Sequence, residues 1–378
     1  MNADAVLSCL QQRGFGLFSG VPCSYLTPLI NAAIDSSTIR YVNAANEGEA
    51  VAICSGAELG GVRALAMFQN SGLGNAVSPL TSLNAIFRIP VLLVCTWRGQ
   101  VGGKADEPQH DLMGRSMANL IENMEIPAAV FPQEEGELQA VLARATKSMD
   151  DSGLPFALLL PEGVIDSRKL ETTPPPRRTR NTRLADLPKN ILDVDACLAT
   201  IGNQAANHQA AVLATTGFTG RALYAHGDRE NQFYMVGSMG CVSSLALGLA
   251  LVHSQKQVIA IDGDGALLMR MSGLAAVAAA APANLTHVVL DNGVHDSTGA
   301  QATLSHMVDI PAVAAACGYP SVATADSIEQ LAQLLSQPQS ELRMIYLRTS
   351  PRTDRNLPRP TITPPMVAQR LRNWLRQS

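Results

Sequence analysis

The sequence predicts an α/β fold built from two doubly wound parallel sheets. Apolar runs of strand length alternate with small-residue helical segments in both halves of the 378-residue chain. Polar or glycine-rich clusters recur where these runs end, at the edge where parallel sheets bind ligands. A stretch rich in proline and arginine divides the chain. We therefore predict domains over 1–170 and 191–378, joined by a linker over 171–190.

The composition excludes several classes of function. A hydrophobic content of 47% supports two cores, and a net charge of −4 without a basic face argues against a nucleic-acid partner. The 7 cysteines form no CxxC pair, which favours reduced thiols and a cytoplasmic location. No signal peptide is indicated, and the apolar runs are too short for a membrane span, so no membrane partner is expected.

The N-terminal half is predicted to hold strands at Phe15–Phe18, Arg40–Val42, Ala64–Phe68, Pro90–Thr96 and Phe156–Leu160. A helix is expected after the second of these strands, from Glu47 through Leu59. A carboxylate at the start of a helix is also explained by the helix dipole, so this pattern alone leaves a functional and a structural interpretation of Glu47 open.

The C-terminal half is predicted to hold strands at Ala211–Ala214, Gln257–Ile261, His287–Leu290 and Met344–Leu347, and a final helix from Pro365. Two of these strands are consecutive in one βαβ unit and end in Gly263-Asp264-Gly265 and Asp291-Asn292-Gly293. The glycines allow an anion to approach the backbone, and the start of the following helix favours phosphate.

The carboxylate of Asp264 and the amide oxygen of Asn292 are hard ligands that suit Mg²⁺ together with phosphate oxygens. Either motif alone is also compatible with an ordinary strand-to-helix turn. The two motifs on consecutive strands predict a site for a metal-bound diphosphate.

This GDG…N arrangement resembles the thiamine diphosphate enzymes, in which the same segment holds Mg²⁺ and the diphosphate of the cofactor. The resemblance implies that Asp264 and Asn292 are metal ligands, that Val294 binds the metal through its carbonyl, and that Ala266 contacts the cofactor beside Gly263 and Gly265. The string DNGVHDSTGAQ at 291–301 is most similar to phosphonopyruvate decarboxylases, with sulfopyruvate decarboxylases close behind.

Further cofactor contacts follow from the resemblance. In the C-terminal half Thr216 and Gly217 match a second turn that contacts the diphosphate. Gly237 and Met239 match a segment that touches the pyrimidine, and there the methionine supports the bent cofactor from below.

The resemblance also gives Glu47 a role. Glu47, Ala50 and Gly56 match the register of a family motif whose glutamate hydrogen-bonds N1′ of the aminopyrimidine, which makes Glu47 the expected catalytic carboxyl. The other cofactor-binding residues expected in this half are Pro22, Gly72 and Asn75.

A segment over 98–110 is expected to be a loop that carries Arg98, Lys104 and His110. The two cations suit an anionic substrate, although an ordinary solvated loop remains an alternative. His110 is a candidate for proton transfer because imidazole titrates near neutrality. Motif register places further side chains beside the substrate: Ser24, His295, Asp296, Ser297 and Thr298.

The resemblance implies two thiamine diphosphate-binding domains without the central third domain of larger relatives. It also implies a homodimer or homotetramer with active sites at subunit interfaces. The expected reaction is the decarboxylation of 3-phosphonopyruvate, a small anionic 2-oxo acid, to phosphonoacetaldehyde and CO₂ with thiamine diphosphate and Mg²⁺. A 3-sulfopyruvate decarboxylase, a carboligase or synthase using the same cofactor, and a noncatalytic cofactor-binding protein remain alternatives.

Overall fold

The computed structural model describes residues 1–174, 176, 182–353 and 356–377. The chain divides into two compact units, Met1–Pro176 and Arg177–Ser378, and the boundary falls within the stretch 171–190. Among the described residues, no helix is both long enough and apolar enough to cross a membrane.

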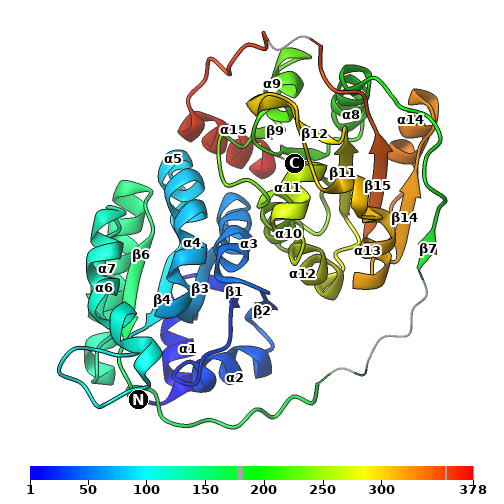
Figure 1. Cartoon of the computed structure of the whole chain (residues 1–378). Helices are drawn as coiled ribbons and strands as arrows, with labels where there is room; N and C mark the ends of the chain where they lie inside the picture. The colour runs from blue at the N-terminus through cyan, green and yellow to red at the C-terminus, as the bar shows by residue number, and fades with distance from the viewer. Residues whose placement is uncertain (175, 177–181, 354–355, 378) are drawn as a thin grey trace. The chain divides into compact units, whose positions relative to one another are not determined.

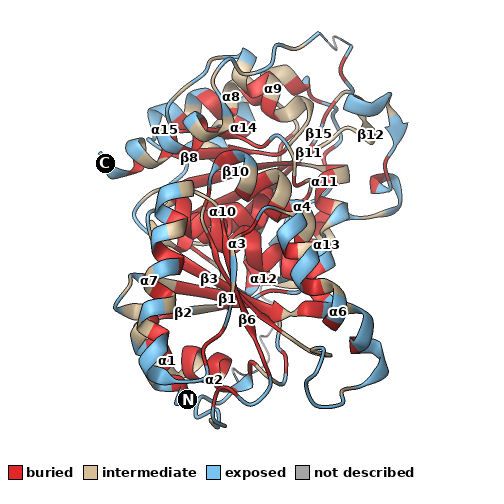
Figure 2. Ribbon diagram, turned by 90° about the vertical axis from the view of Figure 1, so that its left-hand side faces the viewer, coloured by how far each residue is buried: buried red, intermediate tan, exposed pale blue. Residues whose placement is uncertain are grey.

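Unit 1 is built on a parallel sheet with the strand order β2-β1-β3-β4-β6-β5 (Figure 1). Its strands are β1 (Phe15–Gly20), β2 (Arg40–Asn43), β3 (Arg63–Gln69), β4 (Leu92–Thr96), β5 (Ala128–Val130) and β6 (Phe156–Leu160). Figure 2 shows the inner strands β1, β3, β4 and β6 buried between helices whose outer faces are exposed, whereas the edge strands β2 and β5 are partly exposed. The predicted strands of this half are present. The short edge strand β5 was missed, because three residues are too few to show a period.

The helices of unit 1 cover both faces of its sheet. They are α1 (Ala3–Gln11), α2 (Thr27–Asp35), α3 (Glu47–Leu59), α4 (Leu73–Pro79), α5 (Ala85–Phe87), α6 (Pro108–Asn123) and α7 (Glu135–Ser152), with a 3₁₀ turn η1 (Asn70–Gly72) and a π-helical turn η2 (Leu80–Asn84). All 13 residues of α3 are buried, which explains its small side chains. Its start is fixed by Asn46, whose side-chain oxygen accepts the backbone N–H of Glu49 at 3.0 Å.

Unit 2 is built on a second parallel sheet with the order β7-β14-β15-β11-β10-β8-β9. Its strands are β7 (Arg183–Leu184), β8 (Ala211–Ala214), β9 (Gln232–Tyr234), β10 (Val258–Gly263), β11 (Leu285–Asp291), β14 (Ser321–Thr324) and β15 (Arg343–Arg348). The strand β7 pairs with β14 although it falls inside the stretch predicted as a linker. A small antiparallel hairpin, β12 (Val294–His295) and β13 (Gln301–Ala302), follows β11.

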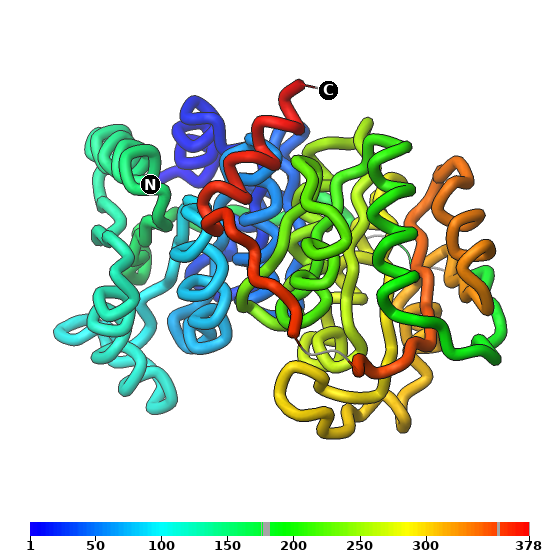
Figure 3. Tube along the Cα trace, turned by 90° about the horizontal axis from the view of Figure 1, so that it is seen from above, coloured from blue at the N-terminus to red at the C-terminus, as the bar shows by residue number. Residues whose placement is uncertain are grey.

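The helices of unit 2 are α8 (Val194–Asn207), α9 (Phe218–Ala225), α10 (Val242–Val252), α11 (Asp264–Met269), α12 (Gly273–Ala280), α13 (Ile310–Cys317), α14 (Ile328–Ser336) and α15 (Pro364–Arg376), with 3₁₀ turns η3 (Asp296–Thr298) and η4 (Ser305–Met307). The parallel register pairs Ile261 with Ala214 and Gly263 with Leu290. The segments that follow β8, β10 and β11 therefore meet at one edge of the sheet. In Figure 3 the hairpin and the turns after it, in yellow, protrude from unit 2.

Candidate active site

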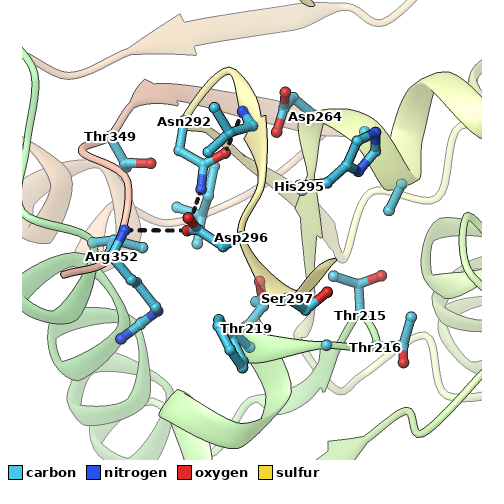
Figure 4. A pocket seen from close by; sticks show the side chains of 18 of the residues that line it. Thr215, Thr216, Thr219, Asp264, Asn292, His295, Asp296, Ser297, Thr349 and Arg352 are labelled. Atoms are coloured by element: carbon cyan, nitrogen blue, oxygen red, sulfur yellow. Dashed lines mark hydrogen bonds between the residues drawn. The ribbon is translucent and has the colours of Figure 1, made fainter. Parts of the chain in front are cut away.

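A pocket lies at the carboxyl ends of β8, β10 and β11 in unit 2 (Figure 4). The predicted residues that line it are Thr216, Gly217, Met239, Gly263, Asp264, Gly265, Ala266, Asn292, Val294, His295 and Ser297. Two of the residues predicted in unit 2 do not line it. Gly237 lies two residues before Met239, and the exposed Thr298 donates its hydroxyl to the carbonyl of His295 at 3.2 Å.

Glycine is required at two positions of this pocket. Gly217 has φ +90°, a backbone conformation that only glycine adopts readily, and it directly precedes α9. A Cβ on Gly265 would lie 2.5 Å from Cε1 of His295. Gly217 therefore allows the turn into α9, and Gly265 leaves room for the His295 ring at the start of α11.

Strained backbone also marks this pocket. Ser238, directly before Met239, has φ +54°, which is uncommon for a residue other than glycine. Such conformations cluster at sites where the surrounding structure holds a side chain in one place. The next residue, Met239, lines the pocket.

Asp264 begins α11, and its side chain is buried. Its Oδ2 accepts a hydrogen bond from the hydroxyl of Thr303. Burial raises the pKa of Asp264 above its ordinary range, and the negative charge of Asp291 raises the pKa further, although the Thr303 hydroxyl opposes the shift. A divalent cation at this carboxylate would favour its ionised form.

The amide of Asn292 is held in one orientation by its neighbours. Its Oδ1 accepts the N–H of Val294 at 3.0 Å, and its Nδ2 donates to Oδ2 of Asp296 at 2.7 Å. The same carboxylate oxygen accepts the backbone N–H of Arg352 at 3.2 Å (Figure 4). An amide oxygen retains a second lone pair, so Asn292 can still coordinate a metal ion.

These residues fit a diphosphate and its metal better than a metal alone. The hydroxyl of Thr215 is buried and has no hydrogen-bond partner among the described residues, so it is available to a phosphate oxygen. No group of three or more His, Cys, Asp or Glu side chains that could hold a metal occurs in the described part of the chain. One carboxylate, one amide and one carbonyl leave coordination positions for phosphate oxygens and water, which is the usual arrangement for Mg²⁺.

A second cluster lies in unit 1 around Glu47, the first residue of α3. The carboxyl of Glu47 is buried, and its Oε2 accepts a hydrogen bond from Nδ2 of Asn75 at 2.7 Å. A Cβ on Gly72 would lie 1.9 Å from Oε1 of Glu47, so only glycine leaves room for this carboxyl. The two residues predicted as cofactor contacts in this turn, Gly72 and Asn75, therefore both touch Glu47.

The neighbouring Glu49 has a different role. Its carboxylate turns back to the start of α3, where it accepts the N–H of Ala45 at 3.1 Å and Nδ2 of Asn46 at 2.8 Å. These are the bonds of a helix N-terminus. The structural interpretation of a carboxylate at this junction therefore applies to Glu49, and the functional interpretation of Glu47 stays a prediction.

Arg98 follows β4, and its charge is already paired. Its guanidinium binds both carboxylate oxygens of Asp106, donates to Oγ of Ser24 at 3.1 Å and lies 4.6 Å from the ring centroid of Tyr25. The prediction that Arg98 serves an anionic substrate did not include Asp106 as its partner. The exposed Lys104 makes no hydrogen bond or ion pair with any described residue.

His110 was expected in a loop, whereas α6 begins at Pro108 and contains it. Proline and a preceding extended residue favour a helix start at this point. The His110 side chain is buried, and its Nδ1 lies 3.5 Å from Oγ of Ser71, a long contact for a hydrogen bond. Pro22 lies before Cys23, whose thiol donates to Oε1 of Gln69 at 3.2 Å.

Sequence reasoning missed four residues of these clusters: Asp106, Thr303, Thr349 and Arg352. The turn over 215–221, whose hydroxyls are predicted to suit phosphate, contributes Thr215, Phe218 and Thr219 to the pocket, and Asp296 also lines it. Thr349 and Arg352 follow β15, and their approach to the pocket depends on the strand order, which no local motif encodes.

Two family matches cover most of both units. Residues 2–116 match "Thiamine pyrophosphate enzyme, N-terminal TPP binding domain", and residues 215–345 match "Thiamine pyrophosphate enzyme, C-terminal TPP binding domain". The chain belongs to the thiamine pyrophosphate enzymes. The resemblance to the thiamine diphosphate (pyrophosphate) family that the sequence motifs indicated is therefore confirmed.

Relatives within the thiamine pyrophosphate enzymes span nearly the whole chain. A phosphonopyruvate decarboxylase of Streptomyces viridochromogenes is 44% identical over 99% of this chain and 95% of its own length. A sulfopyruvate decarboxylase of Methanosarcina acetivorans is 28% identical over 98% of this chain and 97% of its own length. The protein is therefore an enzyme of the decarboxylase branch of this family.

The fold is confirmed by solved structures. Benzoylformate decarboxylase of Polynucleobacter necessarius superposes with a TM-score of 0.68 at 12% identity, covering 94% of this chain and 100% of that chain. The two parallel sheets with flanking helices are the predicted α/β architecture. The described residues form no third domain between them.

Proposed function

We propose that this thiamine pyrophosphate enzyme decarboxylates 3-phosphonopyruvate to phosphonoacetaldehyde and CO₂. The observation that carries this assignment is the match of 99% of the chain, at 44% identity, to a phosphonopyruvate decarboxylase. The match to a sulfopyruvate decarboxylase is weaker, at 28% identity, and makes 3-sulfopyruvate the second candidate substrate.

The cofactor would be held at the carboxyl edges of the two sheets. Asp264, Asn292 and the carbonyl of Val294 would bind Mg²⁺, which is supported by the oxygen donors at this edge. Thr216 and the glycines 217, 263 and 265 would bind the diphosphate, and Met239 with Gly237 would contact the pyrimidine. When bound, thiamine diphosphate supplies an electron sink for the carbon that loses CO₂.

The residues of the chain would control protons and orientation. Glu47, oriented by Asn75, would share a proton with N1′ of the aminopyrimidine. His110 is the proposed donor of the proton that the carbonyl carbon gains after CO₂ leaves. Burial of Glu47 and His110 would exclude water from both transfers.

The anionic end of the substrate needs donors and positive charge. Ser24 and Arg98 are proposed to bind it, because the two side chains are already in contact at the end of the sheet. Lys104, His295, Ser297 and Thr298 are the remaining proposed substrate residues. Their hydroxyl, imidazole and ammonium groups suit a phosphonate or a sulfonate. A carboligase would need a larger and more apolar pocket for its second carbonyl substrate.

A substrate panel tests this function. Phosphonopyruvate, sulfopyruvate and pyruvate would each be incubated with the protein, thiamine diphosphate and Mg²⁺, and CO₂ and the aldehyde product would be measured. We expect the highest kcat/KM for phosphonopyruvate. Preference for sulfopyruvate would move the assignment to the second substrate, and preference for pyruvate would contradict an anion-binding pocket. New carbon–carbon bonds formed with an added aldehyde would favour a carboligase.

The proposal includes a cytoplasmic homodimer or homotetramer in which Glu47 of one subunit and the metal ligands of another serve one cofactor. Mixing two inactive variants, Glu47→Gln and Asp264→Asn, tests this arrangement. Random reassembly into dimers would restore about a quarter of wild-type activity if each site uses two subunits, and none if each site lies within one chain. The seven cysteines form no disulfide among the described residues, which supports a reducing compartment.

A further inference from the structure

A second cavity lies at the amino edge of the unit 2 sheet. It has a volume of about 380 Å³ and is lined by the starts of β10, β11 and β15 and by the ends of α8 and α14. Arg343, the first residue of β15, pairs in register with Thr286, whereas Arg348 at the other end pairs with Asp291. At about 3.3 Å per residue, five steps separate this cavity from the metal edge by roughly 16 Å.

Arg343 brings a buried charge to this cavity without a counter-charge. The residue is 8% exposed, and it forms no ion pair with the carboxylates of the described residues. Its Nη2 makes one long bond to Oγ1 of Thr286, at 3.4 Å, and its Nε is buried without a partner in the described part of the chain. Burial lowers the pKa of Arg343, but a guanidinium remains protonated at neutral pH.

The neutral groups around Arg343 do not supply that counter-charge. Thr286 donates its hydroxyl to Oε1 of Gln339 at 2.7 Å, and Nε2 of Gln339 donates to the carbonyls of Leu285 at 2.6 Å and Glu341 at 3.1 Å. This network is satisfied without a carboxylate. An uncompensated buried cation is strongly unfavourable, so an anion at this position would be bound with a gain in stability.

The cavity lining includes further hydrogen-bond donors. Gln204 and His208 from the end of α8 and Gln257 before β10 line the cavity. No hydrogen bond joins their side chains to other described residues. Two amides and an imidazole in the same cavity as a guanidinium are donors of the kind that hold the oxygens of a small anion.

We propose that this cavity binds a small oxyanion, of the phosphate or carboxylate class, whose charge compensates Arg343. The site is separate from the cofactor pocket. The proposal therefore does not depend on which 2-oxo acid the enzyme decarboxylates.

The test is the thermal stability of the holoenzyme with saturating thiamine diphosphate and Mg²⁺, so that the added anion does not compete for an empty diphosphate site. Inorganic phosphate and malonate are titrated separately, with potassium chloride at equal ionic strength as the reference. Because a ligand that binds the native state alone raises Tm by mass action, we expect a saturable rise in Tm with at least one of the two anions. A rise with phosphate alone assigns a tetrahedral oxyanion, and a rise with malonate alone assigns a carboxylate.

Arg343→Met keeps the length of the side chain and removes its charge. We expect this variant to lose the anion-dependent rise and to have a Tm in chloride equal to or above that of the wild type. Arg183→Met is the matched control, since Arg183 is exposed and paired with Glu341, and it should respond as the wild type does. If Arg343→Met does not fold, Gln257→Leu, which keeps the guanidinium, should require a higher anion concentration for the same rise.

Three results would overturn the proposal. In the first, the Tm of the wild type depends on ionic strength but on neither anion. In the second, the Tm of Arg343→Met rises with the anion as much as that of the wild type. The third applies where Arg343→Met does not fold, and in it Gln257→Leu responds to the anion as the wild type does.

Discussion

Asp106 binds Arg98 through both carboxylate oxygens, and the same guanidinium donates to Ser24. The arginine is therefore fixed before any substrate arrives, and its charge is balanced within the segment that joins β4 to α6. The backbone N–H of Gly99 also donates to Asp106, at 3.0 Å. One carboxylate thus holds both the cation and the start of the loop that carries Lys104.

We predict that Asp106→Asn loosens this segment and lowers kcat/KM by roughly 10-fold to 100-fold, because a displaced Arg98 no longer orients Ser24. Limited trypsin digestion checks the structural part, with faster cleavage after Lys104 in the variant. Asp111→Asn is the control, since Asp111 forms an exposed pair with Arg115 on α6 and its loss should change neither quantity. Equal cleavage rates for Asp106→Asn and the wild type would contradict the role of Asp106 in holding this segment.

The same pair sets an expected pH dependence. The Arg98 guanidinium holds the pKa of Asp106 well below its ordinary range. A carboxyl group whose pKa is lower in the folded than in the unfolded protein stabilises the folded state at any pH above its unfolded pKa of about 3.9. That stabilisation is lost only as the pH falls through the lower pKa of the folded state. Between about pH 5 and 8 the Asp106 contribution is therefore constant. The activity ratio of Asp106→Asn to wild type should be flat over that range, and a slope would show that another group controls the pair.

The two glutamates at the start of α3 should separate activity from stability. Glu47→Gln keeps the bond from Asn75 but cannot take up or release the proton, so we expect kcat to fall by about 100-fold or more with Tm nearly unchanged. Glu49→Gln replaces the carboxylate that accepts two hydrogen bonds at the helix start. The Tm should therefore fall, while the folded protein stays active. Thermal melts measure the Tm of each variant, and CO₂ release measures its kcat. An active Glu47→Gln variant would end the catalytic assignment.

Gly72 and Gly74 form a matched pair of substitutions. A methyl group at Gly72 would overlap the Glu47 carboxyl, whereas nothing lies within 4 Å of a Cβ on Gly74. Gly72→Ala should therefore displace Glu47 and lower kcat by about 100-fold. Gly74→Ala lies inside α4 and should leave activity unchanged and raise stability by up to about 1 kcal/mol. A fully active Gly72→Ala variant would mean that the Glu47 carboxyl can move without cost.

Much of the fold could be predicted because its signals are local. Strands such as Phe156–Leu160 and Ala211–Ala214 are continuous apolar runs, and they occur at the predicted positions. Glycine-containing turns at strand ends likewise predicted Gly217 and Asp264 as candidate site residues, and both line the pocket. Contacts made by distant segments could not be predicted, because they depend on strand order and on a hairpin.

The partner of Asp264 illustrates this limit. Thr303 comes 39 residues later, directly after the hairpin β12–β13, and nothing in its sequence neighbourhood indicates that its hydroxyl reaches this carboxylate. Asp106 likewise follows a glycine-rich segment that resembles an ordinary solvated loop. In both cases the motif residue was identified, but the group that orients it was not.

Thr303→Val provides the last prediction, since it keeps the shape of the side chain and removes the donor to Asp264. Groups that orient a metal ligand commonly contribute 10-fold to 100-fold to metal affinity, so we expect about 10-fold weaker Mg²⁺ binding in the presence of thiamine diphosphate. Calorimetric titration of Mg²⁺ and the Mg²⁺ concentration for half-maximal activity measure it. Saturating Mg²⁺ should restore most of kcat, because the ligands themselves remain. Thr324→Val is the control, since that hydroxyl donates to the carbonyl of Asp186 at an exposed position. Unchanged Mg²⁺ affinity in Thr303→Val would show that Asp264 is oriented by the backbone of α11 alone.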